Sequence, residues 1–277
     1  MSEIKFNNHY IIIFQVDSKN DITTVVELPS EVWNIILNNL TNNTASEKDS
    51  QYIVLSFISS VSKHTNLICE NLKRQLRIQS IKAKPYTFQS YFAKNGYLNC
   101  IIYAHENGCS WNEDTCSYAA ENGHLEILEF AHENGCEWNE YTCSNAAWNG
   151  HLECLKYAHQ NECEWDKWTC ASAAQKGQLE CLKYAHENGC PWNEDTCSYA
   201  AMHGHLETIK FARENGCAWN AATCSYAALN GQLECLKYAH ENGCQWNYET
   251  CYNATSSGHL EILNYAHENG CPCKHKR

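Results

Sequence analysis

A 27-residue repeat runs through residues 84–273 of this 277-residue chain and constrains its fold more than any other feature. Glycine, cysteine and tryptophan each recur at that interval. The three series are Gly96, Gly123, Gly150, Gly177, Gly204, Gly231 and Gly258; Cys116, Cys143, Cys170, Cys197, Cys224 and Cys251; and Trp111, Trp138, Trp165, Trp192, Trp219 and Trp246. A fixed period of this length is typical of solenoids, whose units pack on their neighbours. We therefore expect seven stacked units.

Each unit has the pattern of two short helices. In the unit that begins at Trp111, Asn112 is a suitable N-cap, because its side-chain oxygen can accept a hydrogen bond from an amide of the first helical turn. Gly123 and Gly135 follow the two apolar stretches, where a helix often ends in a left-handed residue. Helices this short are marginal in isolation and must pack on neighbours. The predicted fold class is therefore all-α, a helical repeat solenoid.

The second half of the unit resembles an ankyrin repeat. Gly123-His-Leu-Glu-Ile-Leu-Glu-Phe-Ala-His-Glu-Asn-Gly-Cys-Glu-Trp-Asn is similar to the second helix and exit of that repeat, and the likeness extends from Lys84 to Cys271. The unit is about six residues shorter than the ankyrin unit of about 33. The missing residues fall between Asn112 and Cys116, where an ankyrin repeat forms its β-hairpin finger, so we expect a tight turn there. Shortened units of this kind also resemble ankyrin-type families of giant viruses of amoebae.

The nineteen cysteines are predicted to be free thiols without a metal or cofactor. Their number is odd and no export signal precedes them, which argues against a disulfide framework. No unit has the C-x-x-C spacing of a zinc knuckle, and small buried hydrophobic side chains are a sufficient role for them. A metal-binding array remains a weaker alternative, and Cys271-Pro-Cys-Lys-His is interpreted as the start of a frayed tail. The histidines near the ends of the second helices suit the negative end of a helix dipole. They are His105, His132, His159, His186, His240 and His267.

Composition excludes several classes of function. A formal charge of −12, with the only basic cluster in the tail at residues 274–277, disfavours nucleic acid as a partner. The longest apolar run, Tyr10 to Phe14, is too short to span a membrane, and the first residues lack a signal-peptide pattern. We therefore expect a cytoplasmic protein, in the host cytoplasm if the chain is viral. The repeat distributes the same Glu, His and Cys along the chain instead of converging unlike groups, so no enzyme is expected.

Variation between units indicates where a target protein could bind. The pair of residues after the N-cap and the pair that ends the first helix differ from unit to unit, and in ankyrin-like stacks these positions face the partner. Tyr141, Trp148 and Trp168 are the expected anchors, because large aromatic residues are enriched among binding hot spots. Neutral drift at exposed positions is the alternative explanation. The predicted target-binding residues are Tyr141, Trp148, Lys167, Trp168, Met202, Leu229 and Tyr248. The repeated tryptophans are instead expected to pack between units.

Residues 27–80 lie outside the repeat and predict a small helical module. Pro29 suits the first turn of a helix, and Val32, Ile36 and Leu40 then follow on one face. Leu28-Pro-Ser-Glu-Val followed by Ile-Leu-Asn-Asn-Leu resembles an F-box. That resemblance implies docking on the Skp component of a cullin-based ubiquitin ligase. The Skp-binding residues it implies are Leu28, Pro29, Glu31, Val32, Ile36 and Leu37.

Two functions therefore remain open. In the first, the chain is an adaptor that holds a target protein on its repeats and presents it to a Skp and cullin ligase. In the second, it is a binding scaffold without a ligase, and residues 27–80 only cap the first unit. Residues 1–26 could form a short β-hairpin of Tyr10–Val16 with Ile22–Val26, to which no function is assigned.

Overall fold

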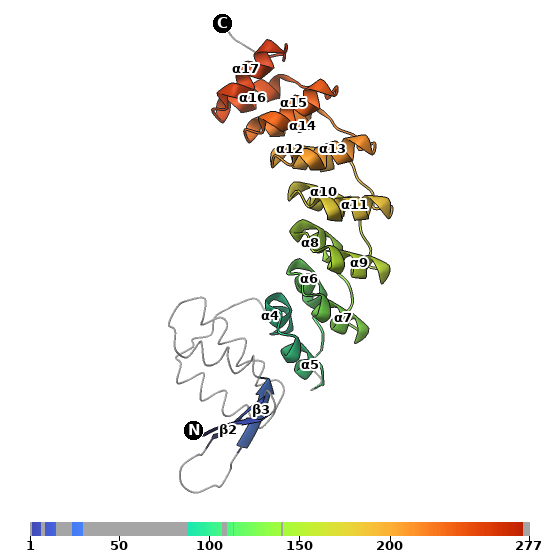
Figure 1. Cartoon of the computed structure of the whole chain (residues 1–277), viewed down its shortest axis with the longest axis vertical. Helices are drawn as coiled ribbons and strands as arrows, with labels where there is room; N and C mark the ends of the chain where they lie inside the picture. Colours follow the sequence, from blue (N-terminus) through green and yellow to red (C-terminus); the bar gives the residue numbers. More distant parts are fainter. Residues whose placement is uncertain are drawn as a thin grey trace. The chain divides into compact units, whose positions relative to one another are not determined.

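The computed structural model describes residues 2–6, 9–14, 24–29, 88–106, 110–112, 114–139 and 141–273 (Figure 1). Most of the expected F-box-like module and the basic tail at 274–277 lie outside these residues. The chain divides into two compact units, residues 1–119 with 126–137 and residues 120–125 with 138–277. Each is described by itself.

The first unit contains a three-stranded antiparallel sheet in the order β1-β2-β3, with β1 at Ser2–Phe6, β2 at His9–Phe14 and β3 at Thr24–Pro29. The sequence suggested only a hairpin of Tyr10–Val16 with Ile22–Val26. In the structure β1 also pairs with β2, with Ile4 opposite Ile11. The placement of Pro29 at a helix start was wrong, because Pro29 is the last residue of β3 and lies opposite His9. Proline is tolerated there, since β3 is an edge strand of the described sheet and an end position need not donate to a ladder.

The repeats form paired helices. In the first compact unit, α4 is Phe88–Asn95, α5 is Leu98–Glu106, α6 is Asp114–Glu121 and α7 is Leu125–Glu133. In the second, the first helices of the pairs are α8 (Thr142–Asn149), α10 (Lys167–Gln175), α12 (Glu194–Met202), α14 (Ala221–Leu229) and α16 (Tyr248–Ser256). The second helices are α9 (Leu152–Gln160), α11 (Leu179–Glu187), α13 (Leu206–Glu214), α15 (Leu233–Glu241) and α17 (Leu260–Glu268). The predicted helical repeat solenoid is confirmed.

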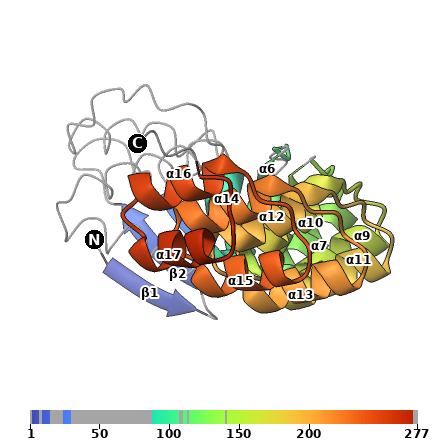
Figure 2. The same cartoon turned by 90° about the horizontal axis from the view of Figure 1, so that it is seen from above.

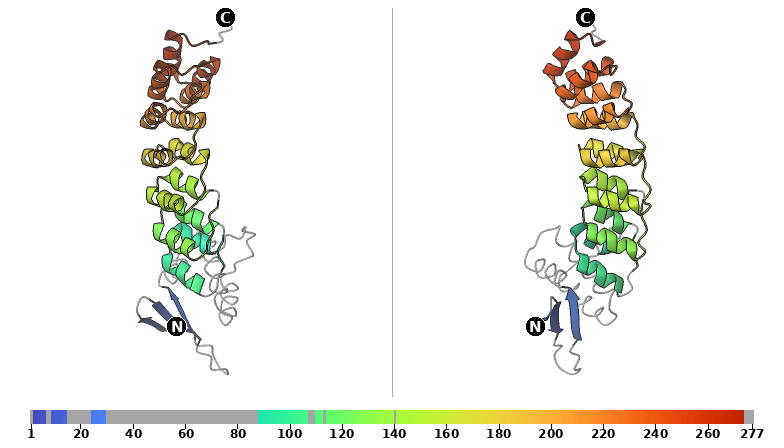
Figure 3. Two further views of the ribbon diagram at one scale, coloured as in Figure 1. Left: turned by 90° about the vertical axis from the view of Figure 1, so that its right-hand side faces the viewer. Right: turned by 45° about the vertical axis from the view of Figure 1, so that its right-hand side comes forward.

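In the second compact unit, each helix pair forms one layer on the next (Figure 3). The first helices pack on one another in one row, and the second helices form a parallel row beside them (Figures 1 and 2). The first helices meet through small side chains such as Ala146, Ala147 and Cys143, which have no exposed surface. The second helices contribute larger core residues, including Leu182 and Leu236. Alanine and cysteine therefore let the first helices approach closely, while leucine fills the space beneath them.

Local signals begin and end these helices as the sequence predicts. Asp166, Asn193, Asn220 and Asn247 are N-caps, and the side-chain oxygen of each accepts a hydrogen bond from the amide two residues later. The helix starts at once after the cap, since the amide of Thr196 donates to the carbonyl of Asn193 at 3.1 Å. The turn that replaces the ankyrin finger is therefore tight, as expected.

The cysteine thiols close this turn. Cys190 donates to the carbonyl of Asp166 at 3.2 Å, and Cys217 makes the same contact with Asn193 one unit later. Each thiol thereby occupies the carbonyl of an N-cap residue. Fifteen of the described cysteines are free and buried, as predicted for reduced thiols. Among the described residues the exception is a disulfide between Cys251 and Cys273, so the prediction of free thiols was wrong for these two cysteines.

Candidate binding surface

The first turns of α8 and α10 carry two exposed aromatic side chains in adjacent repeats. Tyr141 is 56% exposed and Trp168 is 48% exposed, although large aromatic side chains are ordinarily buried. Side-chain oxygens hold the backbone at both positions, because the amide of Tyr141 donates to Asn139 and the amide of Trp168 donates to the N-cap Asp166. Since α8 packs directly on α10 and Trp168 follows Tyr141 by 27 residues, the two rings occupy the same position in adjacent repeats.

Lysines accompany the aromatic residues. The ammonium of Lys167 lies 5.5 Å from the ring centroid of Trp168, and that of Lys176 lies 4.6 Å from the ring of Trp148. Both distances are within cation–π range. The lysine stems also cover part of the rings, and Trp148 is only partly exposed. This stretch of α8 and α10 therefore combines aromatic rings with two lysine side chains, on a chain whose formal charge is −12.

The structure separates the predicted target-binding residues into two groups. Tyr141, Lys167, Trp168 and Tyr248 lie at the N-terminal ends of first helices, whereas Trp148, Met202 and Leu229 lie at the C-terminal ends. Trp148 is seven residues from Tyr141, which places it on the same face of α8 but about 10 Å along the axis. Tyr248 is 44% exposed and lies three repeats beyond Trp168. Only Tyr141, Lys167 and Trp168 therefore lie together at the N-terminal ends of two adjacent first helices, and we call this group the α8/α10 aromatic surface.

The predicted Skp-binding residues are described only in part. Leu28 and Pro29 belong to β3, where Leu28 lies opposite Tyr10 and Pro29 opposite His9. Glu31, Val32, Ile36 and Leu37 lie outside the described residues.

Sequence reasoning missed two exposed apolar side chains at the end of the stack. Tyr252 is 66% exposed and Leu260 is 68% exposed. The position of Tyr252 is occupied by Ser225 and Ser198 in the two preceding units, and both serines are buried. The replacement of this serine by Tyr252 in the last unit was a sequence signal that could have identified the exposed ring.

The repeated tryptophans pack between units, as predicted. Trp165 stacks on His159 at 3.7 Å between ring centroids and meets the edge of Tyr184 in the next pair at 6.2 Å. The same arrangement occurs at Trp192 and Trp246. Where Arg213 replaces the histidine, its guanidinium lies 4.5 Å from the ring centroid of Trp219. These tryptophans are consequently engaged within the stack and are poor candidates for a platform that binds a ligand.

His159 has a different role from the one expected. The sequence suggested a partly cationic side chain at the end of α9. Burial lowers the pKa of His159 from its ordinary value, so the fold disfavours the cation there. Its Nδ1 is hydrogen-bonded to the hydroxyl of Tyr184 at 3.0 Å, and its ring stacks on Trp165. Ring packing therefore explains His159 better than the helix dipole does.

Burial and hydrogen bonding hold several of the buried thiols in their neutral form. Burial raises the pKa of Cys181 and of Cys235 to about 11. A hydrogen bond with the sulphur of Cys163, together with burial, raises the pKa of Cys143. A raised pKa suppresses the thiolate, which is the nucleophile and the metal ligand. Among the described residues, one group could hold a metal ion: Cys251, His267 and Cys273 at the last repeat.

None of the described helices has the length and apolar character needed to cross a bilayer. Residues 116–159 and 197–240 match a family model described as ankyrin repeats (many copies). These two stretches support the resemblance to ankyrin repeats. Such repeats are in general protein-binding scaffolds and not catalytic folds.

One solved ankyrin repeat domain also matches part of the chain. The crystal structure of the human ASB11 ankyrin repeat domain has 16% sequence identity and a TM-score of 0.49, covering 59% of this chain and 85% of that one. No curated protein matches the chain by sequence.

Proposed function

We propose that this chain is a non-catalytic adaptor that holds a target protein on the α8/α10 aromatic surface. The observation that carries the proposal is the exposure of Tyr141 and Trp168, at 56% and 48%, on helices whose caps fix them in place. Exposed aromatic residues that are rigidly held bind at low entropic cost and are enriched among hot spots.

The local charge indicates the character of the target. Lys167 lies beside Trp168 on this surface, so an acidic segment of a partner would find both a ring and an ammonium group. Rim charges of this kind govern the rate and specificity of association more than the affinity. The target is therefore expected to offer an apolar side chain flanked by carboxylates.

Affinity capture from a eukaryotic lysate tests this proposal with a matched pair of variants. Trp168→Ala with Tyr141→Ala removes the surface, and Ala222 already occupies the position of Trp168 two repeats later, so alanine fits the fold there. Tyr252→Ser is the control, because it removes a comparably exposed ring and restores the serine of the preceding units. We expect mass spectrometry to recover the same proteins with wild type and with the control, and to lose them with the double variant.

The dissociation constant for a recovered target measures how much the two aromatic side chains contribute to binding. Loss of a hot spot worth at least 2 kcal/mol weakens binding by about 30-fold. Equal dissociation constants for the wild type and the double variant, measured by calorimetry, would reject the α8/α10 aromatic surface as the binding site.

The second half of the proposal concerns a cytoplasmic ubiquitin ligase. The order of residues Leu28 to Leu40 is similar to an F-box, which supports docking on a Skp-type protein and through it on a cullin. Purified Skp should bind the wild type and Trp168→Ala with equal affinity. The double variant Ile36→Ala with Leu37→Ala should no longer bind Skp. Leu28→Ala with Pro29→Ala should also abolish Skp binding. It is the second test because both residues also pair with β2 in the sheet.

The alternative is a scaffold without a ligase, in which residues 27–80 cap the first repeat. Unchanged Skp binding by both double variants, or no binding by the wild type, would favour it. Capture of the target would be unaffected in that case, so the two halves of the proposal fail separately.

A further inference from the structure

The tryptophan series of the repeat ends in a cysteine. Trp246 is the last tryptophan of the series, and the residue 27 positions later is Cys273. In the same register, Cys251 corresponds to Cys224 of the preceding unit and His267 corresponds to His240. The last unit therefore keeps the usual cysteine and histidine but places a thiol where the other units have an indole.

The interior repeats show what that position contacts. Trp246 stacks on His240 at 3.6 Å between ring centroids. Trp219, which follows Cys197 by 22 residues as Cys273 follows Cys251, packs on the core that contains Cys197. A residue in this position consequently meets both the histidine that ends the second helix and the core cysteine of the first helix. Replacing the indole by a thiol brings three metal-binding side chains to one point.

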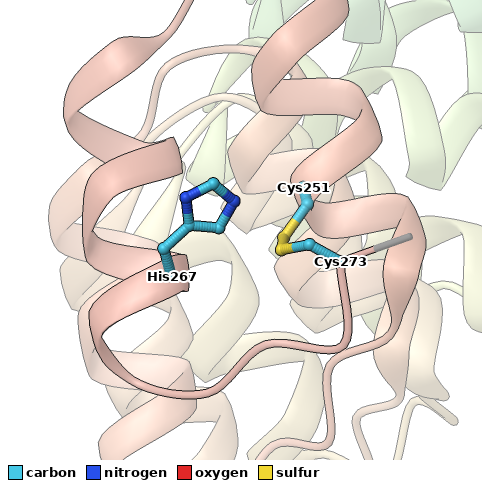
Figure 4. Close-up of side chains that lie close together, drawn as sticks. All are labelled: Cys251, His267 and Cys273. Atoms are coloured by element: carbon cyan, nitrogen blue, oxygen red, sulfur yellow. A yellow bond between two sulfur atoms is a disulfide. The ribbon is translucent and has the colours of Figure 1, made fainter. Parts of the chain in front are cut away.

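The last repeat contains this group. Cys251 comes from α16, His267 from the last turn of α17, and Cys273 from the chain that follows α17 (Figure 4). The ligand atoms of the three residues all lie within 4.8 Å of one another. Cys251 is buried, Cys273 is partly exposed and His267 is exposed, so the group is anchored in the core and open to solvent on one side. Among residues 88–106, 110–112, 114–139 and 141–273 no other group of three meets this criterion.

We propose that Cys251, His267 and Cys273 bind a zinc ion when the two cysteines are reduced. Two thiolates and an imidazole are the ligands that zinc prefers, and a site with three protein ligands leaves the fourth tetrahedral position for water or an external ligand. Soft sulphur ligands select zinc over magnesium or calcium, which require oxygen ligands. The ion joins the residues after α17 to α16, where no further described repeat covers the stack.

The disulfide and the metal are alternative states of the same pair of sulphurs. A dithiol supplies two electrons and two protons to open the bridge, and is itself oxidised to a disulfide. The two thiols of Cys251 and Cys273 then lose their protons to solvent as zinc binds, because the ligands must be thiolates. An external disulfide reverses the sequence: it accepts two electrons from the pair and two protons from solvent, becomes a dithiol, and the re-formed bridge releases the ion.

Metal titration of the full chain tests the proposal. The protein is reduced with a dithiol, freed of it under argon and titrated with cobalt, which reports thiolate ligands by a charge-transfer band and tetrahedral geometry by its visible spectrum. Zinc is then measured in competition with a chromogenic chelator. We expect one site with both spectral features that zinc displaces.

Three variants assign the site. Cys273→Trp restores the residue of the other repeats, and Cys273→Ser removes the sulphur with little change in size. We expect both to weaken zinc binding by more than about 100-fold, since even the outer-shell partners of metal ligands contribute 10–100-fold. Cys244→Ala removes a buried thiol from the preceding repeat and should bind as the wild type does.

Either of two results would overturn the proposal. One is a wild-type cobalt spectrum without thiolate bands, which would leave the disulfide as the only bond between these sulphurs. The other is undiminished zinc affinity in Cys273→Ser with its helical circular dichroism intact, which would assign the ion to other thiols. If Cys273→Trp loses its helical signal, Cys273→Ser alone decides.

Discussion

The interior repeats and the last repeat have nearly the same sequence but differ in what they expose. Ser225 in α14 is 2% exposed, whereas Tyr252, at the same position of α16, is 66% exposed. A Cβ atom added at Gly231 would lie 2.8 Å from the ring of His259, but one added at Gly258 would meet nothing within 4 Å. A position in this fold is thus buried by the unit that follows it, and its own sequence does not decide its environment.

The largest expected difference concerns the leucines of the second helices. Leu236 in α15 has no exposed surface, so Leu236→Ala should lower the free energy of unfolding by about 3 kcal/mol. Leu260 at the start of α17 is 68% exposed, and Leu260→Ala should change it by less than about 0.5 kcal/mol. Urea denaturation measures both. Equal losses would show that the last repeat is covered in solution.

Glycine substitutions provide a second, smaller contrast. Gly177 has φ +68°, and a Cβ there would lie 2.5 Å from the ring of His205, whose Nε2 is hydrogen-bonded to the carbonyl of Gln175. Gly177→Ala should therefore cost about 2–3 kcal/mol, from the left-handed backbone and the displaced ring. Gly258→Ala has the backbone cost alone, about 1–2 kcal/mol. Thermal unfolding that ranks Gly258→Ala as the more damaging would contradict the comparison.

One interior repeat departs from the pattern and allows a stabilising change. Glu162 has φ +64° at a position where Gly189, Gly216 and Gly243 occupy the other repeats. Non-glycine residues are strained there, so Glu162→Gly should raise the free energy of unfolding by about 0.5–1 kcal/mol. Glu164→Gly, two residues later and without a positive φ, should give no gain. If Glu164→Gly alone raised the free energy of unfolding, backbone strain at Glu162 would be refuted.

The smallest effect is a dependence of stability on pH. Burial lowers the folded-state pKa of His159 and of His205, so the unfolded chain binds protons more readily than the folded one. The free energy of unfolding should therefore fall as the pH drops through about 6.5, the ordinary pKa of histidine. His159→Phe keeps a ring against Trp165 and should show a shallower fall. A steeper fall in this variant would be inconsistent with the lowered pKa.

The parts of the fold that depend on local signals were predictable. Asn193, Gly204, Gly216 and the apolar positions between them define a helix pair within one unit, and the 27-residue period multiplies it. Pro29 was misplaced because proline suits both a helix start and the end of an edge strand, and pairing with β2 decides between them.

The sites depend on contacts between units and were harder to predict. Trp148 and Tyr141 vary among repeats in the same way, yet they lie at opposite ends of α8. Cys251, His267 and Cys273 converge only because the chain returns to α16 after α17, although the replacement of the seventh tryptophan by cysteine was visible in the sequence. Periodicity predicts the scaffold, and departures from periodicity mark its candidate sites.

Hydrogen–deuterium exchange of the chain with and without a captured target tests the binding surface most directly. The account predicts slower exchange of backbone amides at the N-terminal turns of α8 and α10, where Tyr141 and Trp168 lie, and no change at α16 and α17. Protection confined to α16 and α17, or spread evenly over all repeats, would contradict it.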